Sequence, residues 1–286
     1  MCKCRFATMK WIVILSCFLS LSSNAQDALQ GVYIEEWYRV KKKDLSAQEL
    51  SGPIDADAVT YRIYLDLAPG CRFQAAYGSP AHAFSIKSNA NFFNHAEVGN
   101  FNVNIIPERM LKRNLVALDS WLSAGAVSEN LVGMPLETDI AGVDEIYDFE
   151  KGFYNSSKKS ERNSIREVDG AHRGAFVSFP TFYNMDTATS VLGSVSRGNI
   201  FQVNNGAWAC LGKGSVGVDS LGVNMVLIGQ FTTSGGLEYK MNVMIRNNDG
   251  KSLKYVCENP QDGEILLPCL KGEILNENNK KKKSKK

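Results

Sequence analysis

Alternation of apolar and polar residues is the dominant pattern along this chain. It is clearest between Val59 and Leu67, where every second residue is apolar. Because side chains of a strand point alternately to the two faces of a sheet, this segment is predicted to be a half-buried strand. Similar segments, separated by clusters of Gly, Pro, Asn and Asp, predict further strands. They span residues 73–77, 83–86, 101–106, 118–123, 174–179, 191–203, 224–232 and 237–245.

Helical periodicity is short by comparison. The best candidate is Ile106–Arg113, where Pro107 would occupy the first turn. Turn sequences such as Ala68-Pro69-Gly70 and Ser234-Gly235-Gly236 separate the predicted strands at intervals typical of sandwiches and jelly rolls. We therefore predict an all-β fold, a β-sandwich or jelly roll.

Composition changes between residues 144 and 167, which are rich in charged residues, Asn and Ser and lack periodicity. This predicts a surface loop or linker. We expect an N-terminal β-sandwich-like half at 26–145, a loop or linker at 146–167, a C-terminal β-sandwich-like half at 168–272, and a disordered basic tail at 273–286. The pattern leaves open whether the halves have separate cores or complete one another's sheets.

The first 25 residues have the layout of a signal peptide. Basic residues precede an apolar run, Trp11–Leu21, and small residues lead up to a cleavage site after Ala25. The run is shorter than the roughly 20 residues that a membrane-spanning helix needs. We expect a secreted or cell-surface protein, located in the periplasm or at the outer-membrane exterior. The alternative is a lipoprotein signal at Ile14–Cys17, with Cys17 acylated.

Charge is unevenly distributed along the chain. The formal charge is +2, but the leader contributes +3 and the tail +6, so residues 26 to 279 carry −7. Clustered lysines attract phosphate-rich or acidic polymers by counterion release. We therefore expect the tail to bind an acidic polysaccharide or another extracellular polyanion, although it could equally serve as a solubilising tail. The tail lysines are Lys280, Lys281, Lys282, Lys283, Lys285 and Lys286.

Four cysteines follow the leader, an even number that favours disulfides in an oxidising compartment. They are Cys71, Cys210, Cys257 and Cys269. Cys257 and Cys269 flank a turn-rich stretch, and a reversal between two short strands would bring them together. We predict this pair, although three pairings are possible.

Candidate catalytic groups are sparse. His82, His95 and His172 are the only histidines, and no Gly-x-Ser-x-Gly motif accompanies them. We therefore assign no catalytic residue. A glycosidase would need two facing carboxylates. The chain offers Glu35, Glu36, Asp66, Asp144, Glu145, Asp148 and Glu150, without indicating which of them face each other.

Two other kinds of site have candidates. Asp55, Asp57, Asp144 and Asp148 lie in expected loops and could bind calcium; no other cofactor is expected. Exposed aromatic rings can stack on sugars. Trp37, Tyr154 and Tyr183 have polar or charged neighbours and are the predicted ligand-binding residues, whereas Trp121 and Trp208 are predicted to be core residues.

Several segments, taken in order, resemble uncharacterised secreted modular proteins of Bacteroidetes-type bacteria. The similar stretches are 59–66, 70–78, 92–94, 119–122, 226–233 and 255–268. The resemblance implies an exported bacterial protein. Relatives often carry a type IX secretion sorting domain, which is absent here, where lysines follow the Leu267-Pro268 segment.

Together these patterns favour a non-enzymatic binding or structural protein of the cell exterior. Adhesion, or binding of matrix or polysaccharide, is the leading hypothesis. The alternative is a secreted polysaccharide-active hydrolase that uses paired loop carboxylates.

Overall fold

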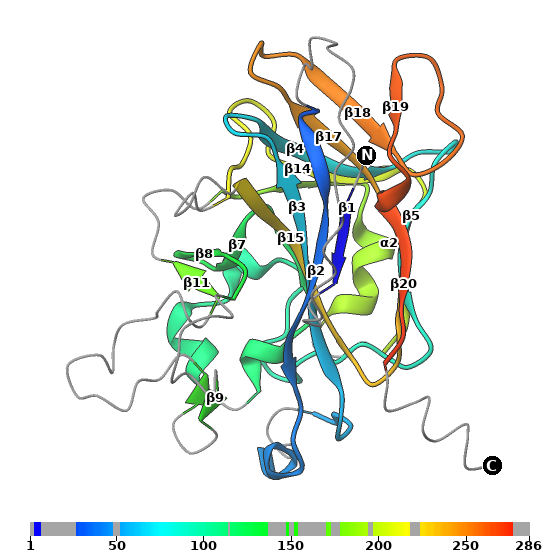
Figure 1. The fold of residues 1–286 in the computed structure, drawn as a ribbon. Helices are drawn as coiled ribbons and strands as arrows, with labels where there is room; N and C mark the ends of the chain where they lie inside the picture. Colours follow the sequence, from blue (N-terminus) through cyan, green and yellow to red (C-terminus); the bar gives the residue numbers. More distant parts are fainter. Residues whose placement is uncertain are drawn as a thin grey trace, which may run out of the picture.

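The computed structural model has an all-β, sandwich-like fold, as predicted (Figure 1). The structure describes residues 3–6, 27–47, 52–113, 115–136, 147–148, 152–153, 170–172, 178–193, 197–217 and 224–276. Most of the predicted signal peptide, most of the predicted linker, and the lysine tail lie outside the described residues. No helix in the described part of the chain is long and apolar enough to cross a membrane.

Three larger sheets form the framework. The central sheet contains, in spatial order, β1 (Lys3–Phe6), β2 (Leu29–Arg39), β3 (Val59–Leu67), β15 (Asn224–Thr233) and β6 (Trp121–Leu122). A six-stranded sheet contains β12 (Thr181–Tyr183), β14 (Gly206–Ala209), β4 (Arg72–Gly78), β17 (Asn242–Arg246), β18 (Ser252–Val256) and β19 (Glu264–Leu266). A four-stranded sheet contains β13 (Ile200–Val203), β5 (Phe84–Ser88), β16 (Leu237–Lys240) and β20 (Lys271–Ile274).

Smaller elements complete the described chain. One small sheet is formed by β11 (Ala171–His172), β8 (Leu131–Gly133) and β7 (Ala126–Ser128), and another by β10 (Gly152–Phe153) and β9 (Tyr147–Asp148). The only α-helix in the described residues is α2 (Asp186–Thr189). The 3-10 helices are η1 (Lys42–Ala47), η2 (Val103–Ile105), η3 (Glu108–Lys112), η4 (Val116–Leu118), η6 (Ser190–Leu192) and η7 (Pro268–Leu270).

The chain passes five times between the six-stranded and four-stranded sheets, at β4 to β5, β12 to β13, β13 to β14, β16 to β17 and β19 to β20. Met241 forms the passage from β16 to β17, where its backbone N–H donates to the Leu270 carbonyl at 2.8 Å and its side chain is buried. The predicted strand 237–245 is therefore two strands in different sheets. Both sheets pack against the same face of the central sheet.

The N-terminal and C-terminal halves complete one another's sheets. β3 pairs with β15, β4 with β14 and β17, and β5 with β13 and β16. Partners more than 100 residues apart in the chain therefore share every larger sheet. The sequence left open whether the two halves have separate cores or share sheets, and this pairing shows that they share sheets.

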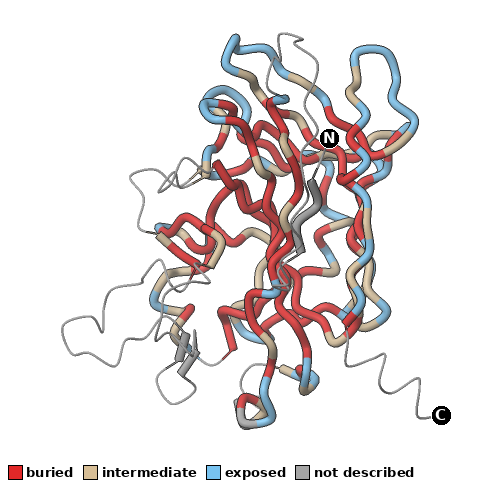
Figure 2. The backbone as a smooth tube through the Cα atoms, viewed as in Figure 1, coloured by how far each residue is buried: buried red, intermediate tan, exposed pale blue. Residues whose placement is uncertain are grey.

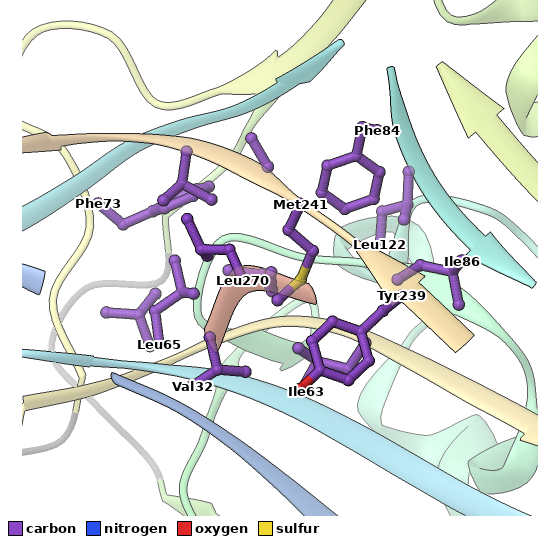
Figure 3. Packing of buried hydrophobic residues seen from close by; sticks show 14 of the residues in the cluster. Val32, Ile63, Leu65, Phe73, Phe84, Ile86, Leu122, Tyr239, Met241 and Leu270 are labelled. Carbon is purple, nitrogen blue, oxygen red and sulfur yellow. The ribbon is translucent and has the colours of Figure 1, made fainter. Parts of the chain in front are cut away.

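The first hydrophobic core lies between the central sheet and the other two large sheets. Ile63 and Leu65 of β3 meet Phe73 of β4 and Phe84 and Ile86 of β5 (Figure 3). Trp208 is buried here, with its ring centroid 4.9 Å from that of Phe84, and its indole N–H donates to the Ser123 carbonyl at 2.9 Å. The core position predicted for Trp208 is confirmed.

A second core covers the opposite face of the central sheet. Leu227 of β15 and Tyr64 of β3 pack there against Trp121 and the 115–118 segment. All ten residues of β15 and most of β3 are consequently buried (Figure 2). The core position predicted for Trp121 is confirmed, but the prediction that 59–67 is half-buried is wrong, because a layer of irregular chain covers its polar face.

Two local predictions have mixed outcomes. The predicted strand at 101–106 contains η2 instead, because Asn100 and Asn102 accept the N–H groups of Asn102 and Asn104 at 2.9 and 3.1 Å. Such side-chain acceptors compete with strand pairing. The predicted short helix near Pro107 is present as η3, with Pro107 immediately before it.

Candidate functional site

A polar pocket of about 500 Å³ lies at the end of the central sheet where β3 begins and β15 ends. It is the end drawn at the bottom of Figure 1, where β2 leads into η1. Four separate segments of the chain build its wall. The lining residues are Gly52, Pro53, Ile54, Asp55, Ala58, Asn91, Phe92, Phe93, Asn94, Ala96, Arg197, Thr232, Thr233 and Ser234.

The floor of the pocket is apolar and fixed by backbone hydrogen bonds. Phe92 and Phe93 are buried, and so are Ile54 and Ala58. The Phe93 N–H donates to the Thr232 carbonyl and the Phe92 N–H donates to the Gly198 carbonyl, both at 2.8 Å. The 91–94 segment is therefore held between the end of β15 and the residues that precede β13.

The rim of the pocket is polar. Asp55, Asn91 and Arg197 are exposed there. The Ser234 hydroxyl donates to Asp55 Oδ2 at 2.6 Å, which fixes the carboxylate against the end of β15. Within the described contacts, Asp55 and Arg197 form no ion pair with each other, so the rim presents one anionic and one cationic group separately.

Asn276 joins two walls of the pocket. Its side-chain amide donates to the carbonyls of Asp57 and Ser234 at 3.3 and 3.2 Å. Arg39 donates in turn to Asn276 Oδ1 at 3.1 Å. The loop that carries Asp55 is thus tied both to β2 and to the turn after β15, and the pocket is held open by folded structure.

The predicted calcium ligands do not form a metal site in the part of the chain that the structure describes. No group of three or more His, Cys, Asp and Glu side chains there could hold a metal ion. Asp55 lines the pocket and Asp57 does not. Asp144 and the side chain of Asp148 lie outside the described residues.

Trp37 does not present an exposed ring to a ligand. It is only 1% exposed, and the Arg62 guanidinium carbon lies 3.8 Å from its ring centroid. Such a cation–π contact stabilises a buried arginine. The prediction that Trp37 binds ligand is wrong, because Trp37 packs into the second core.

Arg62 belongs to a buried polar network that the sequence analysis did not identify. Glu35, Arg62 and Gln230 occupy directly paired positions on β2, β3 and β15. Arg62 Nε donates to Gln230 Oε1 at 2.9 Å, and its Nη1 donates to the Gly170 carbonyl at 3.0 Å. The alternation of Arg62 with apolar neighbours resembles that of a solvent-facing residue, so no local signal indicated its burial.

This network holds both ends of the 137–169 segment. Glu35 Oε1 accepts the Leu136 N–H at 2.7 Å, and the Tyr64 hydroxyl donates to the Met134 carbonyl at 2.9 Å. On the other side, Gly170 has a φ of 70°, and a Cβ there would lie 2.8 Å from Arg62 Nη1. The network therefore has a structural role: it fixes Met134, Leu136 and Gly170, which flank that segment.

Two fully buried carboxyls have raised pKa values. Burial raises the pKa of Glu35 to about 7, against the opposing effects of Arg62 and the Leu136 N–H. Burial also raises the pKa of Asp119 to about 8, although the backbone N–H groups of His95 and Asn100 oppose this by donating to it at 2.7 and 2.9 Å. Neither residue lines the pocket.

Tyr183 is the one predicted aromatic residue that the structure shows to be exposed. Its side chain is 45% exposed on β12, the edge strand of the six-stranded sheet, and it does not line the pocket. Tyr154 and the tail lysines lie outside the described residues. The structure therefore does not bring Trp37, Tyr154 and Tyr183 together as one described site.

The predicted Cys257–Cys269 bond is not formed in this structure. Cys71, Cys210 and Cys257 have free, buried thiols, so Cys257 is not bonded to Cys269. The prediction assumed a simple strand reversal, but β18 and β19 run parallel, with Val256 beside Leu266. The chain then turns into η7, which carries Cys269 into the core.

The three histidines lie within the fold and outside the pocket lining. His82 Nε2 lies 2.8 Å from Glu264 Oε2, and both side chains are largely buried. His95 is buried, and its Nδ1 accepts the N–H groups of Glu97 and Val98 at 3.3 and 3.4 Å. His172 lies in β11. None of the three lines the pocket.

Of the pocket residues, only Asp55 was a candidate site residue in the sequence analysis, where it was a candidate calcium ligand. The other lining residues are common loop and strand residues whose proximity depends on long-range pairing. Comparison of the chain with protein-family models, curated proteins and solved structures found no match.

Proposed function

We propose that this chain is an exported binding protein that holds a carbohydrate in the polar pocket and acts in adhesion or matrix binding at the cell exterior. The observation that carries the proposal is the composition of the pocket, an apolar floor beneath a rim of amide, hydroxyl, carboxylate and guanidinium groups. A sugar ring needs this combination, because its C–H face is apolar and its edge carries hydroxyls. The volume of about 500 Å³ lies within the usual range for small-molecule sites.

Hydrogen-bonding capacity at the rim suits hydroxyl groups. Asn91 supplies both a donor and an acceptor, and Asp55 can accept on Oδ1, the oxygen that Ser234 does not use. The rim groups come from segments fixed by backbone and side-chain bonds, so little ordering is needed on binding. Pre-organisation of this kind lowers the entropic cost of association.

Binding is favoured over hydrolysis by the carboxylates of the pocket. A glycosidase places two carboxyl groups about 5 to 9.5 Å apart across the scissile bond. Among the described lining residues Asp55 is the only carboxylate. We therefore assign Asp55 to ligand binding and assign no catalytic residue.

Export and the lysine tail support a role outside the cell. The signal-peptide layout of residues 1–25, and the resemblance to secreted proteins of Bacteroidetes-type bacteria, both agree with it. The six tail lysines would add salt-dependent attraction to acidic polymers. Changing Lys280–Lys283 to glutamine is expected to lower retention on an anionic column; unchanged retention would contradict the role proposed for the tail.

A glycan array and a reducing-sugar assay on the exported chain test the proposal. We expect retention of one class of glycan without release of reducing ends above a blank. Asp55→Asn should weaken binding at least about tenfold, because hydrogen bonds to a charged group contribute about 1.5 to 3 kcal/mol. Asp262→Asn, an exposed change in the turn before β19, is the matched control and should leave binding unchanged.

Failure to bind any glycan would refute the proposal. Release of reducing ends, abolished in Asp55→Asn, would replace it with the hydrolase alternative.

A further inference from the structure

We infer that the pocket selects a sugar bearing one carboxylate, a uronic acid, and that Arg197 is the residue that binds the acid group. This inference rests on the proposed function, since it names the class of sugar for the same pocket. It depends on three features of the structure: the fixed backbone beside Arg197, the lack of a counter-ion for Arg197 within the described chain, and the separate position of Asp55.

The backbone that follows Arg197 is bonded to two neighbouring segments of the fold. The Gly198 carbonyl accepts the Phe92 N–H at 2.8 Å, which joins it to the pocket floor. Asn199 exchanges two bonds with Ser88, each at 2.8 Å: its carbonyl accepts the Ser88 N–H, and its side-chain amide donates to the Ser88 carbonyl. Arg197 therefore enters the pocket from a fixed point of the fold.

Close packing also fixes Gly198. A Cβ at Gly198 would lie 2.9 Å from a methyl carbon of Val191, and the Val191 carbonyl accepts the side-chain amide of Asn94 at 2.8 Å. Residues 191, 198 and 94 thus form one packed unit beside the pocket. This geometry keeps Arg197 next to the floor formed by Phe92 and Phe93.

The Arg197 guanidinium has no counter-ion among the residues that the structure describes. It is exposed, lines the pocket, and forms no ion pair or hydrogen bond with the described residues. A guanidinium presents its N–H donors in a planar fork that matches a carboxylate with two parallel bonds. Arg197 is the only cationic side chain among the described lining residues, so it is the group on which a ligand carboxylate would bind.

Asp55 limits the number of acid groups that the pocket accepts. Its carboxylate is held by Ser234 and would repel a second anion. Sugar hydroxyls, in contrast, donate well to a carboxylate. A uronic acid has one carboxylate and several hydroxyls on a single ring, so its acid group fits Arg197 while its hydroxyls fit Asp55 and Asn91.

The test compares short uronic acids with their neutral methyl esters. The probes are trisaccharides of galacturonate, glucuronate, mannuronate and guluronate, each paired with its methyl-esterified form. They are titrated by calorimetry into the exported chain at physiological salt. We expect at least one acid to bind about 10- to 100-fold more tightly than its ester, the range of a charge-assisted hydrogen bond.

Variants then locate the acid group. Arg197→Gln should abolish the preference for the acid while leaving the affinity for the ester unchanged, and Arg197→Lys should retain part of it, because a lysine keeps the charge but lacks the planar fork. Arg109→Gln removes one exposed positive charge from η3, away from the pocket lining, and should have no effect. Glutamine at Lys280–Lys283 should likewise leave the trisaccharide affinity unchanged.

Each contrary outcome is decisive. Equal affinity for acid and ester overturns the inference and leaves the proposed carbohydrate binding intact. A preference that persists in Arg197→Gln also overturns it, since the acid group would then be bound elsewhere. A preference lost on changing the tail lysines assigns the acid group to the tail and overturns the role of Arg197. No binding of any glycan, acidic or neutral, refutes the proposed function itself.

Discussion

Glu35 makes the stability of this protein depend on pH, and Glu35→Gln should remove that dependence. The carboxyl is fully buried between Arg62, Tyr64 and the Leu136 N–H, and its pKa rises from 4.5 to about 7 on folding. Glutamine has nearly the same shape and keeps the acceptor for Leu136. It therefore resembles the protonated form of Glu35 at every pH.

The sign follows from proton binding. Between pH 4.5 and about 7, the folded state keeps the Glu35 proton while the unfolded state has lost it. The free energy of unfolding therefore falls as pH rises through this window, and the loss is complete above the folded pKa. One pKa unit corresponds to about 1.4 kcal/mol, so the contribution of Glu35 reaches about 3 kcal/mol.

Urea denaturation at pH 5, 6, 7 and 8 measures this contribution. We expect the stability of Glu35→Gln relative to the unchanged protein to rise by about 2.5 kcal/mol between pH 5 and 8, because part of the effect already lies below pH 5. Glu36→Gln alters an exposed neighbour on β2 and should show no such change. A constant stability difference between Glu35→Gln and the unchanged protein across this range would refute the reasoning.

Three further changes test the packing. Arg62→Met removes the hydrogen bonds to Gln230 and Gly170 and leaves Glu35 without its partner charge. We therefore expect chemical denaturation to show a fall of about 3 to 5 kcal/mol in the free energy of unfolding. A fall of less than about 1 kcal/mol would contradict the role of the network. Trp208→Ala opens a cavity beside Phe84 and should also cost about 3 to 5 kcal/mol, and calorimetry showing an unchanged melting temperature would disprove this burial. Gly170→Ala places a Cβ against Arg62 at a φ of 70°, so we expect the free energy of unfolding to fall by about 1 to 3 kcal/mol and proteolysis between residues 137 and 169 to become faster. Protease resistance equal to that of the unchanged protein would contradict the structural role of the network around Arg62.

The sequence was informative wherever local alternation coincides with burial. β3, β4 and β15 were predicted within one or two residues, because β-branched and aromatic residues between turn signals are sufficient to define a strand. The core positions of Trp121 and Trp208 followed from the same pattern. β2 was missed because adjacent Glu35 and Glu36, together with a register shift between Glu36 and Tyr38, interrupt the alternation.

The sequence did not predict that the polar face of β3 and β15 is buried. Arg62, Thr60 and Gln230 have the spacing of solvent-facing residues, and they are buried because irregular chain covers that face of the central sheet. The same layer buries Trp37, which changes it from a candidate binding ring into the partner of Arg62. A covering layer is a long-range feature, and no local periodicity records it.

The pocket was likewise decided only by tertiary structure. Its lining comes from residues 52–58, 91–96, 197 and 232–234, which meet because β3 pairs with β15 and the 91–94 segment bonds to both sides. By itself, the sequence determined the strand-forming segments and the all-β class, because alternation, turn residues and side-chain branching act within a few residues. The tertiary structure decided which strands are neighbours, which charges are buried and where a ligand fits, because those depend on contacts between residues far apart in the chain.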